Sequence, residues 1–347
     1  ILMYEEELTE ALRIDLNKSY EEAFMTEISI VLGEIDNFQK NLARWAAPSK
    51  KSTPLKLFPS RSEVITEPLG VALIIAPWNY PVQLLLNPLV GAISAGCTAI
   101  LKPSPYVESV STVIEKMIAE TFAENYIAVV QGNRDVNTAL LEQRYDIIFF
   151  TGSPSLGRKV MAAAAKNLTP VVLELGGKSP CIVDSSANIA TVARRIAWGK
   201  CLNAGQTCIA PDYLLVHHSV KERLVEALER EFKSLLGENP KQAKHFVRIV
   251  NERAFDRLVG YFKDGDIVVG GQTERSERFI APTILDNVNP ESAVMQDEIF
   301  GPIFPVVTFQ TTDEAINFVT SREKPLALYY FGKSGKQVIR TTSSGGA

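Results

Sequence analysis

The stretch from Pro68 to Leu101, PLGVALIIAPWNYPVQLLLNPLVGAISAGCTAIL, contains no charged residue over 34 positions. Its length alone would permit a transmembrane helix. However, prolines interrupt such a helix and amide side chains would lack water in lipid; the residues concerned are Pro77, Pro81, Pro88, Asn79, Gln83 and Asn87. The stretch therefore predicts a strand, a turn, a buried helix and a second strand in a protein core, and the membrane span is the weaker alternative.

The alternation of apolar strands and helices continues along the chain to about residue 175. We expect strands at 71–76, 98–101, 127–130, 147–150 and 171–173, and helices at 82–95, 108–122, 136–143 and 153–166. This pattern is typical of an α/β fold with a doubly wound, mostly parallel, Rossmann-like sheet. Ligands bind such sheets beyond the carboxyl ends of the strands. The loops after Ala76, Leu101, Val130 and Phe150 are therefore candidate binding loops.

The regions on either side of this alternation complete the domain organisation. Apolar residues recur at helical spacing through residues 1–47, and the charged run 54–66 predicts an exposed hairpin around Pro59-Ser60. From about Gly176 a second α/β pattern starts, with strands at 181–183, 213–216, 267–269, 305–309 and 326–331 and helices at 190–201, 220–236, 252–262 and 313–320. We therefore expect two domains, 1–175 with the N-terminal helices and the dinucleotide-binding sheet, and 176–347.

Composition excludes several classes of function. The chain has 36 Lys and Arg against 40 Asp and Glu, a net charge of −4, and it has no basic block, so nucleic acid is a poor candidate partner. Four cysteines in 347 residues do not suggest a disulfide framework. No CxxC motif or Cys/His cluster offers a metal site. We expect a reducing, cytoplasmic setting and no metal.

The segment Phe150-Thr-Gly-Ser-Pro-Ser-Leu-Gly157 follows a predicted strand and opens a predicted helix. Glycines let a ligand approach the backbone, and a helix N-terminus favours anionic groups such as phosphate. The segment is neither a G-x-G-x-x-G fingerprint nor a P-loop, because Arg158 and Lys159 stand where a P-loop needs Lys and Ser/Thr. A tight turn with a capped helix is the structural alternative.

Cys208 ends the segment Asn203-Ala-Gly-Gln-Thr-Cys208, just ahead of a predicted strand. A thiolate on an exposed loop is a strong nucleophile, whereas most cysteines are buried and inert. Cys97, Cys181 and Cys201 fit the buried class, because they lie within or beside apolar elements. No histidine has an obvious place as a base, which disfavours a Cys–His protease.

Two further polar residues stand at strand ends. Glu174 lies among apolar residues, and a partly desolvated Glu with a raised pKa can act as a general base. Its structural alternative is a surface carboxylate paired with Lys178. Asn79 carries an amide donor that can help to stabilise an oxyanion. Its structural alternative is the cap of the following helix.

Taken together, these segments resemble the aldehyde dehydrogenase superfamily. Six matching pieces occur in the family's order: Pro77-Trp-Asn-Tyr-Pro81, Leu101-Lys-Pro-Ser104, Phe150-Thr-Gly-Ser153 with Gly157, Leu173-Glu-Leu-Gly-Gly-Lys-Ser-Pro180, Gly205-Gln-Thr-Cys208 and Glu298-Ile-Phe-Gly-Pro302. The short N-terminal region, Pro-Trp-Asn-Tyr-Pro and the run Arg-Glu-Lys-Pro-Leu-Ala-Leu-Tyr at 322–329 are most similar to the class 3 branch.

The resemblance implies a mechanism and residue roles. Cys208 would attack the aldehyde carbon, the Asn79 amide and the Cys208 backbone N–H would hold the oxyanion, and Glu174 would activate water to hydrolyse the thioester. The cofactor would be NAD or NADP. The residues implied to contact it are Trp78, Lys102, Gly152, Ser153, Gly157, Glu298 and Phe300.

Two departures from the family pattern bear on these expectations. Family members often have an acidic residue after Lys-Pro-Ser that binds the adenosine ribose, but here Pro105 and Tyr106 follow. Without that carboxylate nothing repels a 2′-phosphate, so NADP joins NAD as an expected cofactor. Relatives also continue past Ser344-Gly-Gly with a further segment and dimer contacts, so we expect a catalytic domain incomplete at its C-terminal end, and a homodimer at full length.

Two alternatives to the hydrolytic enzyme remain open. A relative that transfers the acyl group to coenzyme A is disfavoured by Glu174, because a base for water has no use there. An inactive nucleotide-binding or structural relative is disfavoured by the presence of Cys208, Glu174 and Asn79 together.

Overall fold

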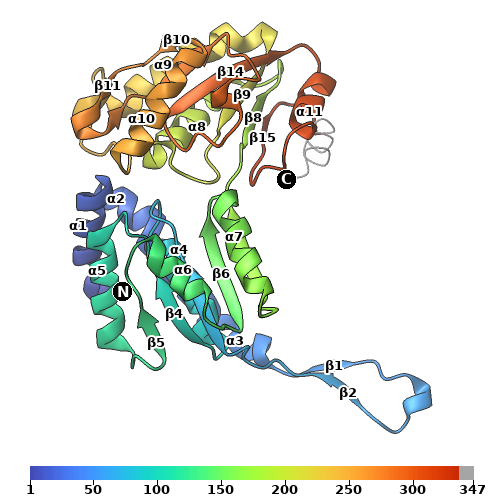
Figure 1. The fold of residues 1–347 in the computed structure, drawn as a ribbon. Coiled ribbons are helices and arrows are strands. Elements are labelled where there is room, and N and C mark those ends of the chain that lie inside the picture. Colours follow the sequence, from blue (N-terminus) through green and yellow to red (C-terminus); the bar gives the residue numbers. More distant parts are fainter. Residues whose placement is uncertain (336–347) are drawn as a thin grey trace. The chain divides into compact units, whose positions relative to one another are not determined.

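The computed structural model describes residues 1–335, which form two compact units (Figure 1). Unit 1 comprises Ile1–Ala11 and Ala23–Glu174, and unit 2 comprises Leu12–Glu22 and the chain from Leu175 onward. The segment Leu12–Glu22 thus packs with the second unit, although the sequence pattern grouped it with the first. The Ser344-Gly-Gly segment lies outside the described residues.

Unit 1 contains a five-stranded sheet in the order β5-β4-β3-β6-β7. β3 pairs in parallel with β4 on one side and with β6 on the other, and β4 pairs in parallel with β5. The strand order reverses at β3, which is the signature of a doubly wound sheet. The predicted fold class is therefore confirmed. The strands are β3 (Val71–Ile75), β4 (Thr98–Lys102), β5 (Ile127–Val129), β6 (Ile147–Gly152) and β7 (Val171–Leu175).

The helices of the N-terminal half follow the predicted positions closely. α3 packs against α4, α5 against β5, and α7 against β6. β3, α4 and β4, which the uncharged stretch forms, contribute buried residues such as Leu73, Leu85 and Leu101. The helices are α1 (Glu5–Leu16), α2 (Tyr20–Ala23), α3 (Ser29–Ala46), α4 (Gln83–Ser94), α5 (Glu108–Thr121), α6 (Arg134–Leu141) and α7 (Pro154–Ala165), with a π-helical turn at Phe24–Ile28. Within residues 1–335, no helix combines the length and the apolarity that crossing a membrane requires.

The start of α4 is capped by a residue from a distant part of unit 1. α4 has no capping bond from its own N-cap residue, Val82. Instead the buried carboxylate of Glu27 accepts hydrogen bonds from the backbone N–H groups of Val82 and Gln83, both at 3.0 Å. A carboxylate at a helix N-terminus satisfies orphan donors and opposes the positive end of the helix dipole. Glu27 therefore fixes the turn that runs from β3 into α4.

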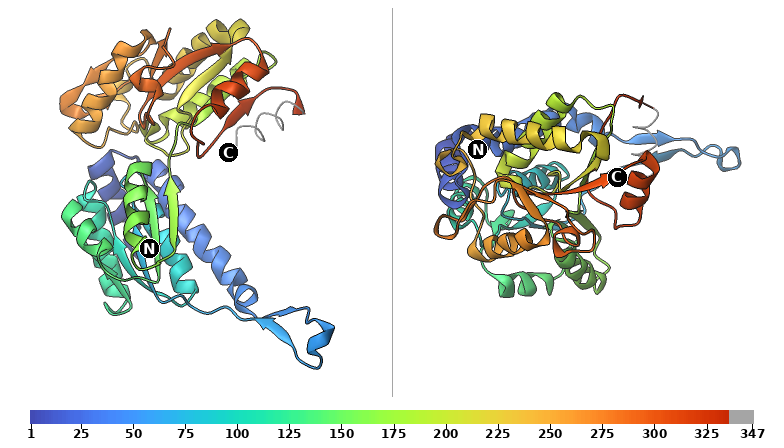
Figure 2. Two further views of the ribbon diagram at one scale, coloured as in Figure 1. Left: turned by 45° about the vertical axis from the view of Figure 1, so that its right-hand side comes forward. Right: turned by 90° about the horizontal axis from the view of Figure 1, so that it is seen from above.

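The predicted hairpin exists, but its first strand lies earlier than expected. β1 (Ser49–Lys51) pairs antiparallel with β2 (Ser62–Val64), and the run expected as the first strand forms a 3-10 turn at Leu55–Leu57. Pro54 and Pro59 flank that turn and have no N–H to donate to a ladder, which explains the shift. The hairpin extends away from the rest of unit 1 (Figures 1 and 2).

Unit 2 contains a six-stranded sheet in the order β10-β13-β14-β9-β8-β15. β10 is antiparallel to β13, and the other pairs are parallel. The sequence analysis missed β13, a short strand directly after Pro282 with too few apolar residues to stand out. The strands are β8 (Pro180–Val183), β9 (Tyr213–His217), β10 (Asp266–Val269), β13 (Thr283–Asp286), β14 (Ile303–Phe309) and β15 (Tyr329–Phe331), with a separate hairpin of β11 (Thr273–Glu274) and β12 (Phe279–Ile280).

The core of unit 2 lies between this sheet and a pair of helices. α8 packs against α9, and both contribute buried apolar residues to one cluster with β8, β9 and β14. Asn188 caps α8 through its side chain, and Asn251 caps α10 in the same way. The helices are α8 (Ile189–Cys201), α9 (Lys221–Leu236), α10 (Glu252–Gly260) and α11 (Thr312–Thr320).

We predict that Glu27→Ala destabilises unit 1 by about 3 kcal/mol, because the buried Val82 N–H and the partly buried Gln83 N–H lose a charged acceptor. Glu27→Gln keeps an acceptor oxygen and should cost about half as much. Chemical denaturation monitored by circular dichroism measures the change. Asp36→Ala, which changes an exposed carboxylate on α3, is the matched control and should lie within about 0.5 kcal/mol of the parent. An equal loss in both alanine variants would contradict the capping role.

Candidate active site

In unit 1, Trp78, Asn79, Gly152 and Ser153 lie at the carboxyl ends of β3 and β6, the two neighbouring strands where the strand order reverses. This is the edge at which doubly wound sheets bind ligands. Asn79 is buried, with 2% of its surface exposed. Glu27, and not Asn79, accepts the hydrogen bonds from the Val82 and Gln83 N–H groups at the start of α4.

The segment after β6 forms the capped turn that the sequence allowed. The Ser153 hydroxyl accepts a hydrogen bond from the Leu156 N–H at 3.4 Å, and Pro154 occupies the first helical position of α7. Gly157 is buried in the first turn of this helix. The N-terminus of a 12-residue helix thus points out of the ligand-binding edge of the sheet, an arrangement suited to an anionic group.

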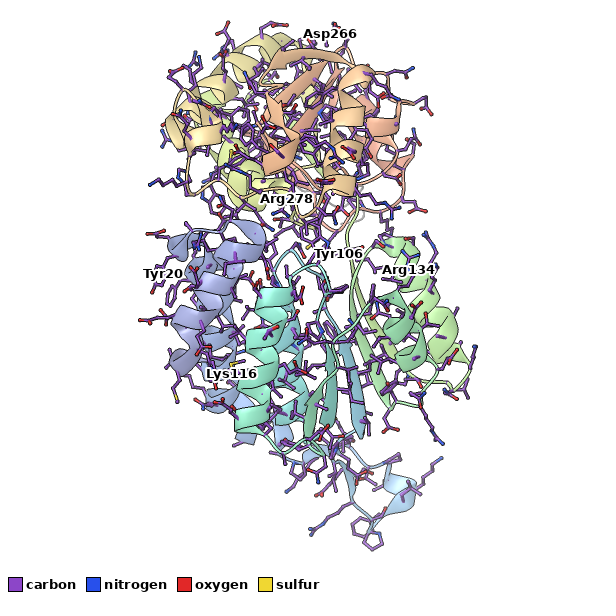
Figure 3. All side chains as sticks on the ribbon, turned by 60° about the vertical axis from the view of Figure 1, so that its left-hand side comes forward. Tyr20, Tyr106, Lys116, Arg134, Asp266 and Arg278 are labelled. Atoms are coloured by element: carbon purple, nitrogen blue, oxygen red, sulfur yellow. The ribbon has the colours of Figure 1, made fainter. Side chains whose placement is uncertain are left out.

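Lys102 ends β4 at the same edge. Its side chain is 1% exposed, and its amine donates a hydrogen bond to the Pro103 carbonyl at 2.7 Å. Burial lowers the pKa of Lys102 to about 8. Tyr106, in the loop after this strand, is 56% exposed (Figure 3). The loop therefore presents an aromatic ring and no carboxylate.

Glu174 lies in the edge strand β7, and its side chain is exposed. The sequence pattern predicts partial desolvation of Glu174, whereas its side chain is exposed on β7 of unit 1. An edge strand has a neighbour on one side only, and here alternate residues of β7, Val172 and Glu174, face solvent. Glu174 also lines an apolar groove of about 470 Å³ formed by α3, α4, β3 and β6.

In unit 2, three segments converge at the amino ends of neighbouring parallel strands. Gly176–Ser179 precedes β8, Asn203–Asp212 precedes β9, and Gln296–Pro302 precedes β14. Because β14, β9 and β8 are adjacent and parallel, the three segments meet at one edge of the sheet. Cys208, Glu298 and Phe300 all lie on these segments.

The segment that carries Cys208 has an unusual and firmly held backbone. Asn203 and Ala204 both adopt left-handed conformations, with φ of 51° and 50°, and Gly205 follows with φ of 72°. A Cβ atom on Gly205 would lie 2.4 Å from the carbonyl oxygen of Gly301, so only glycine fits. The Cys208 segment and the Glu298 segment are therefore in direct backbone contact.

Buried side chains anchor the same segment on both sides of the turn. The Gln206 amide donates to the carbonyls of Asn203 and Arg248, both at 3.1 Å, and its oxygen accepts from the Val250 N–H at 3.0 Å. Every polar atom of that side chain is thus used. The Tyr329 hydroxyl donates to the Ile209 carbonyl, one residue past Cys208. These contacts fix the backbone on either side of the cysteine.

The four cysteines fall into two groups, and none forms a disulfide. Cys97 and Cys181 are buried, and burial raises the pKa of the Cys181 thiol. Cys201 is partly exposed as a residue, but burial of its thiol raises the pKa to about 12. Cys208 is partly exposed and lies on a loop, which suits a nucleophile better than the other three positions do.

Glu298 is half-buried against the Gly176-Gly177 turn. Desolvation raises the pKa of its carboxyl to about 8, and the charge of Asp212 acts in the same direction. The Gly177 N–H bonds to this carboxyl and partly offsets both effects. A Cβ atom on Gly176 would lie 2.3 Å from the carboxylate, so the turn and the acid are in contact. Phe300 follows in a left-handed conformation, with φ of 52°.

Lys178 and Asp212 form a buried ion pair that the sequence analysis missed. Their charged atoms are 2.5 Å apart, and the side chains are 10% and 4% exposed. The sequence had offered Lys178 only as a surface partner of Glu174. The sequence indicates Asp212 only weakly, as an acidic residue between Pro211 and a predicted buried strand.

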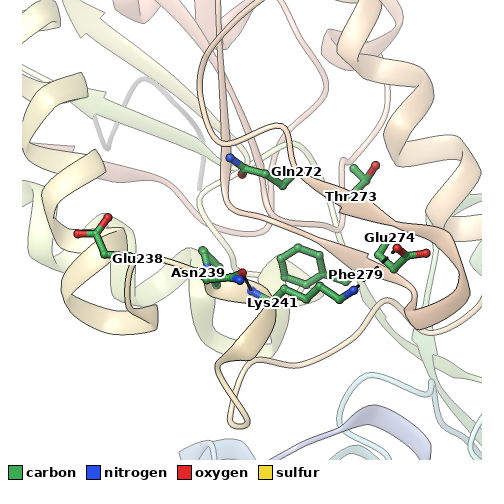
Figure 4. A pocket seen from close by; sticks show the side chains of 8 residues that line it. Glu238, Asn239, Lys241, Gln272, Thr273, Glu274 and Phe279 are labelled. Carbon is green, nitrogen blue, oxygen red and sulfur yellow. Dashed lines mark hydrogen bonds and ion pairs between the residues drawn. The ribbon is translucent and has the colours of Figure 1, made fainter.

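A second hollow, in unit 2, has a different character. It encloses about 390 Å³ beside the β11–β12 hairpin (Figure 4). Lys241, which lines it, forms ion pairs with Glu277 at 2.9 Å and Glu274 at 3.8 Å. No predicted site residue lines it, and its charged lining residues, Glu238, Lys241 and Glu274, carry two negative charges and one positive charge. Among the described residues, no group of three or more His, Cys, Asp or Glu side chains could hold a metal ion.

Comparisons with known proteins agree with this arrangement of motifs. Residues 1–345 match the Aldehyde dehydrogenase family. The chain is 48% identical to 4,4'-diaponeurosporen-aldehyde dehydrogenase of Staphylococcus aureus, over 100% of this chain and 76% of that protein. It is 46% identical to aldehyde dehydrogenase family 3 member B2 of Mus musculus, over 98% of this chain and 71% of that protein.

The structural comparison gives the same result. The structure of substrate-bound Staphylococcus aureus AldH superposes with a TM-score of 0.97 and 47% identity, over 99% of this chain and 75% of that one. The predicted resemblance to the class 3 branch is confirmed by the family 3 relative. With six motifs in order, the predicted fold and these matches, the chain belongs to the aldehyde dehydrogenase family, whose members are enzymes that oxidise aldehydes.

Proposed function

We propose that this chain oxidises an aldehyde to a carboxylic acid with NAD or NADP, using Cys208 as the nucleophile and water as the final acceptor. The observation that carries the proposal is the Cys208 segment. It carries Cys208, a partly exposed residue, on a backbone held by Gln206 and Gly205, in contact with the loop that carries Glu298.

The proposed chemistry assigns a separate role to Cys208, Asn79 and Glu174. The Cys208 thiolate adds to the aldehyde carbon, and the Cys208 N–H and the Asn79 amide stabilise the resulting alkoxide. When bound, the cofactor's nicotinamide supplies the acceptor for the hydride that leaves this carbon, and Cys208 is then held as a thioester. Glu174 removes a proton from water, whose oxygen adds to the thioester carbon. Release of the acid regenerates the Cys208 thiolate.

The residues present fit a dinucleotide. The capped N-terminus of α7, with Gly152, Ser153 and Gly157, suits the pyrophosphate. Trp78, in the loop after β3, and Lys102, the last residue of β4, lie at the same sheet edge. Glu298 is proposed to bind the nicotinamide ribose, with Phe300 beside it.

Two alternatives are separated by product analysis. A coenzyme A-acylating enzyme would form a product that depends on coenzyme A, whereas hydrolysis needs water only. An inactive relative would form no reduced cofactor from any aldehyde. The exposed position of Glu174 is open to water and favours hydrolysis.

A cytoplasmic setting and a homodimer form part of the same proposal. The absence of a disulfide among four cysteines supports a reducing compartment. The dimer rests on the family resemblance alone.

We predict distinct defects for the two main catalytic groups. Cys208→Ala should lower kcat about 10³-fold or more, because no covalent intermediate forms. Glu174→Gln should still release one equivalent of reduced cofactor in a rapid burst and then turn over about 10²-fold more slowly, because the thioester accumulates. Stopped-flow absorbance at the reduced nicotinamide band measures both. Cys201→Ala is the control and should retain activity; full activity in Cys208→Ala would refute the mechanism.

We predict that cofactor affinity rises with pH up to about 8, the pKa to which burial raises Glu298, and then levels off. Below this pH the carboxyl is protonated, and binding through ribose hydroxyls that donate to a carboxylate must release a proton. Cofactor Kd measured by fluorescence quenching should therefore fall by up to about tenfold per pH unit below 8. Glu298→Gln should bind with no such dependence, and an unchanged slope in this variant would assign the titration elsewhere.

We predict comparable kcat/KM for NAD and NADP, within about tenfold, because Pro105 and Tyr106 occupy the position where a carboxylate would repel the 2′-phosphate. Initial rates with one aldehyde and both cofactors measure the ratio. Pro105→Glu should shift the preference toward NAD. A parent enzyme that prefers NAD by several thousand-fold would contradict the expectation.

A further inference from the structure

One buried ion pair in unit 2 joins the three segments that converge at the amino ends of β8, β9 and β14. Lys178 belongs to the first segment and Asp212 to the second, and their charged atoms are 2.5 Å apart. Both residues are outside the set to which the family resemblance assigns a role. Their contacts reach the third segment, which carries Glu298.

Lys178 directs its amine onto that third segment. Besides Asp212, it donates to the carbonyl of Val294 at 2.7 Å and to the carbonyl of Asp297 at 3.1 Å. An ammonium has three protons, so all of its donors are accounted for by these three acceptors. The residue before Lys178 is Gly177, whose N–H bonds to the Glu298 carboxyl. One short stretch therefore holds both the backbone and the acid group of the Glu298 loop.

Asp212, in the second segment, contacts both the first and the third segment. One carboxylate oxygen pairs with Lys178, and the other accepts the Ile299 N–H at 2.8 Å. Its own N–H donates to the Ser179 carbonyl at 2.8 Å. Asp212 lies four residues after Cys208, so it ties the nucleophile segment directly to Ile299 after Glu298, and through Lys178 to Asp297 before it.

We propose that Lys178 and Asp212 are positioning residues that hold the Glu298 loop in register with the Cys208 segment. The proposal rests on the roles proposed above for Cys208 and Glu298. Without the pair, the backbone of Val294, Asp297 and Ile299 would lose three hydrogen bonds on either side of Glu298. The loop would then present its carboxylate to the cofactor over a range of positions.

The experiment compares Lys178→Met, Asp212→Ala and the milder Asp212→Asn in the full chain. Asp286→Asn is the matched control, because Lys221 and Asp286 form a similar pair in unit 2, 2.7 Å apart with 19% and 17% exposure, that contacts none of the three segments. The readouts are cofactor Kd, KM and kcat, and the melting temperature.

We expect Lys178→Met and Asp212→Ala to raise the Kd and KM for the cofactor about tenfold or more, with a smaller increase for Asp212→Asn, which keeps an acceptor for the Ile299 N–H. Asp286→Asn should change KM less than about twofold even where its melting temperature falls. If Lys178→Met or Asp212→Asn folds and keeps the parent Kd and KM, or if the control shows the same loss of affinity, the proposal is overturned.

A double-mutant cycle tests whether the pair acts through Glu298. If it does, Glu298→Gln combined with Lys178→Met should bind cofactor no more than about twofold more weakly than Glu298→Gln alone. Fully multiplicative losses would show that Lys178 acts by another route and would overturn the proposal. Cofactor Kd needs no turnover, so failure of the proposed Cys208 chemistry, seen as an active Cys208→Ala variant, is distinguishable from failure here.

Discussion

Parallel pairing is the constraint on which the arrangement of candidate residues depends. Neighbouring parallel strands begin at one edge of a sheet and end at the other, so loops far apart in sequence are brought together at each edge. In unit 1 the relevant edge is the carboxyl end, where Asn79 and Ser153 follow β3 and β6 and Lys102 ends β4. In unit 2 it is the amino end, where Lys178, Cys208 and Glu298 precede β8, β9 and β14. Unit 1 thus places its candidate polar groups at the carboxyl ends of its strands, and unit 2 places its own at the amino ends.

The long, buried strands of this architecture were predictable from sequence. Buried parallel strands are nearly continuous apolar runs, so Val71–Ile75 and Ile147–Gly152 stand out without any knowledge of their partners. Short or polar strands do not. β13 has four residues and borders a proline, and its place inside a sheet, between β10 and β14, depends on strand pairing that no local pattern records. The hairpin was displaced for a related reason, because proline chemistry, and not apolar alternation, decided where its ladder could form.

The residues of the candidate site fall into two groups, those that local sequence identifies and those whose environment depends on strand pairing. Cys208, Asn79 and the α7 turn were identified from local chemistry, namely a residue type and its place beside a strand or helix. The burial of Glu298 and the exposure of Glu174 depend on which strand is central and which is an edge, so sequence reasoning had no means to assign them. The pairing of Lys178 with Asp212 is further out of reach, because it depends on the register of β8 against β9 and on the course of the loop before β14.

Unit 2 buries charge at this edge where apolar side chains would serve stability as well. A buried ion pair seldom stabilises a fold more than apolar residues of the same volume, since desolvation offsets most of the attraction. Lys200 shows the same tendency nearby: it is buried, donates to the Pro211 carbonyl at 2.8 Å, and has its pKa lowered to about 8 by burial. Charged side chains form a fixed number of directed hydrogen bonds, which apolar side chains cannot form. Here those bonds end on the backbone on both sides of Glu298 and just past Cys208, the positions whose geometry the proposed chemistry requires.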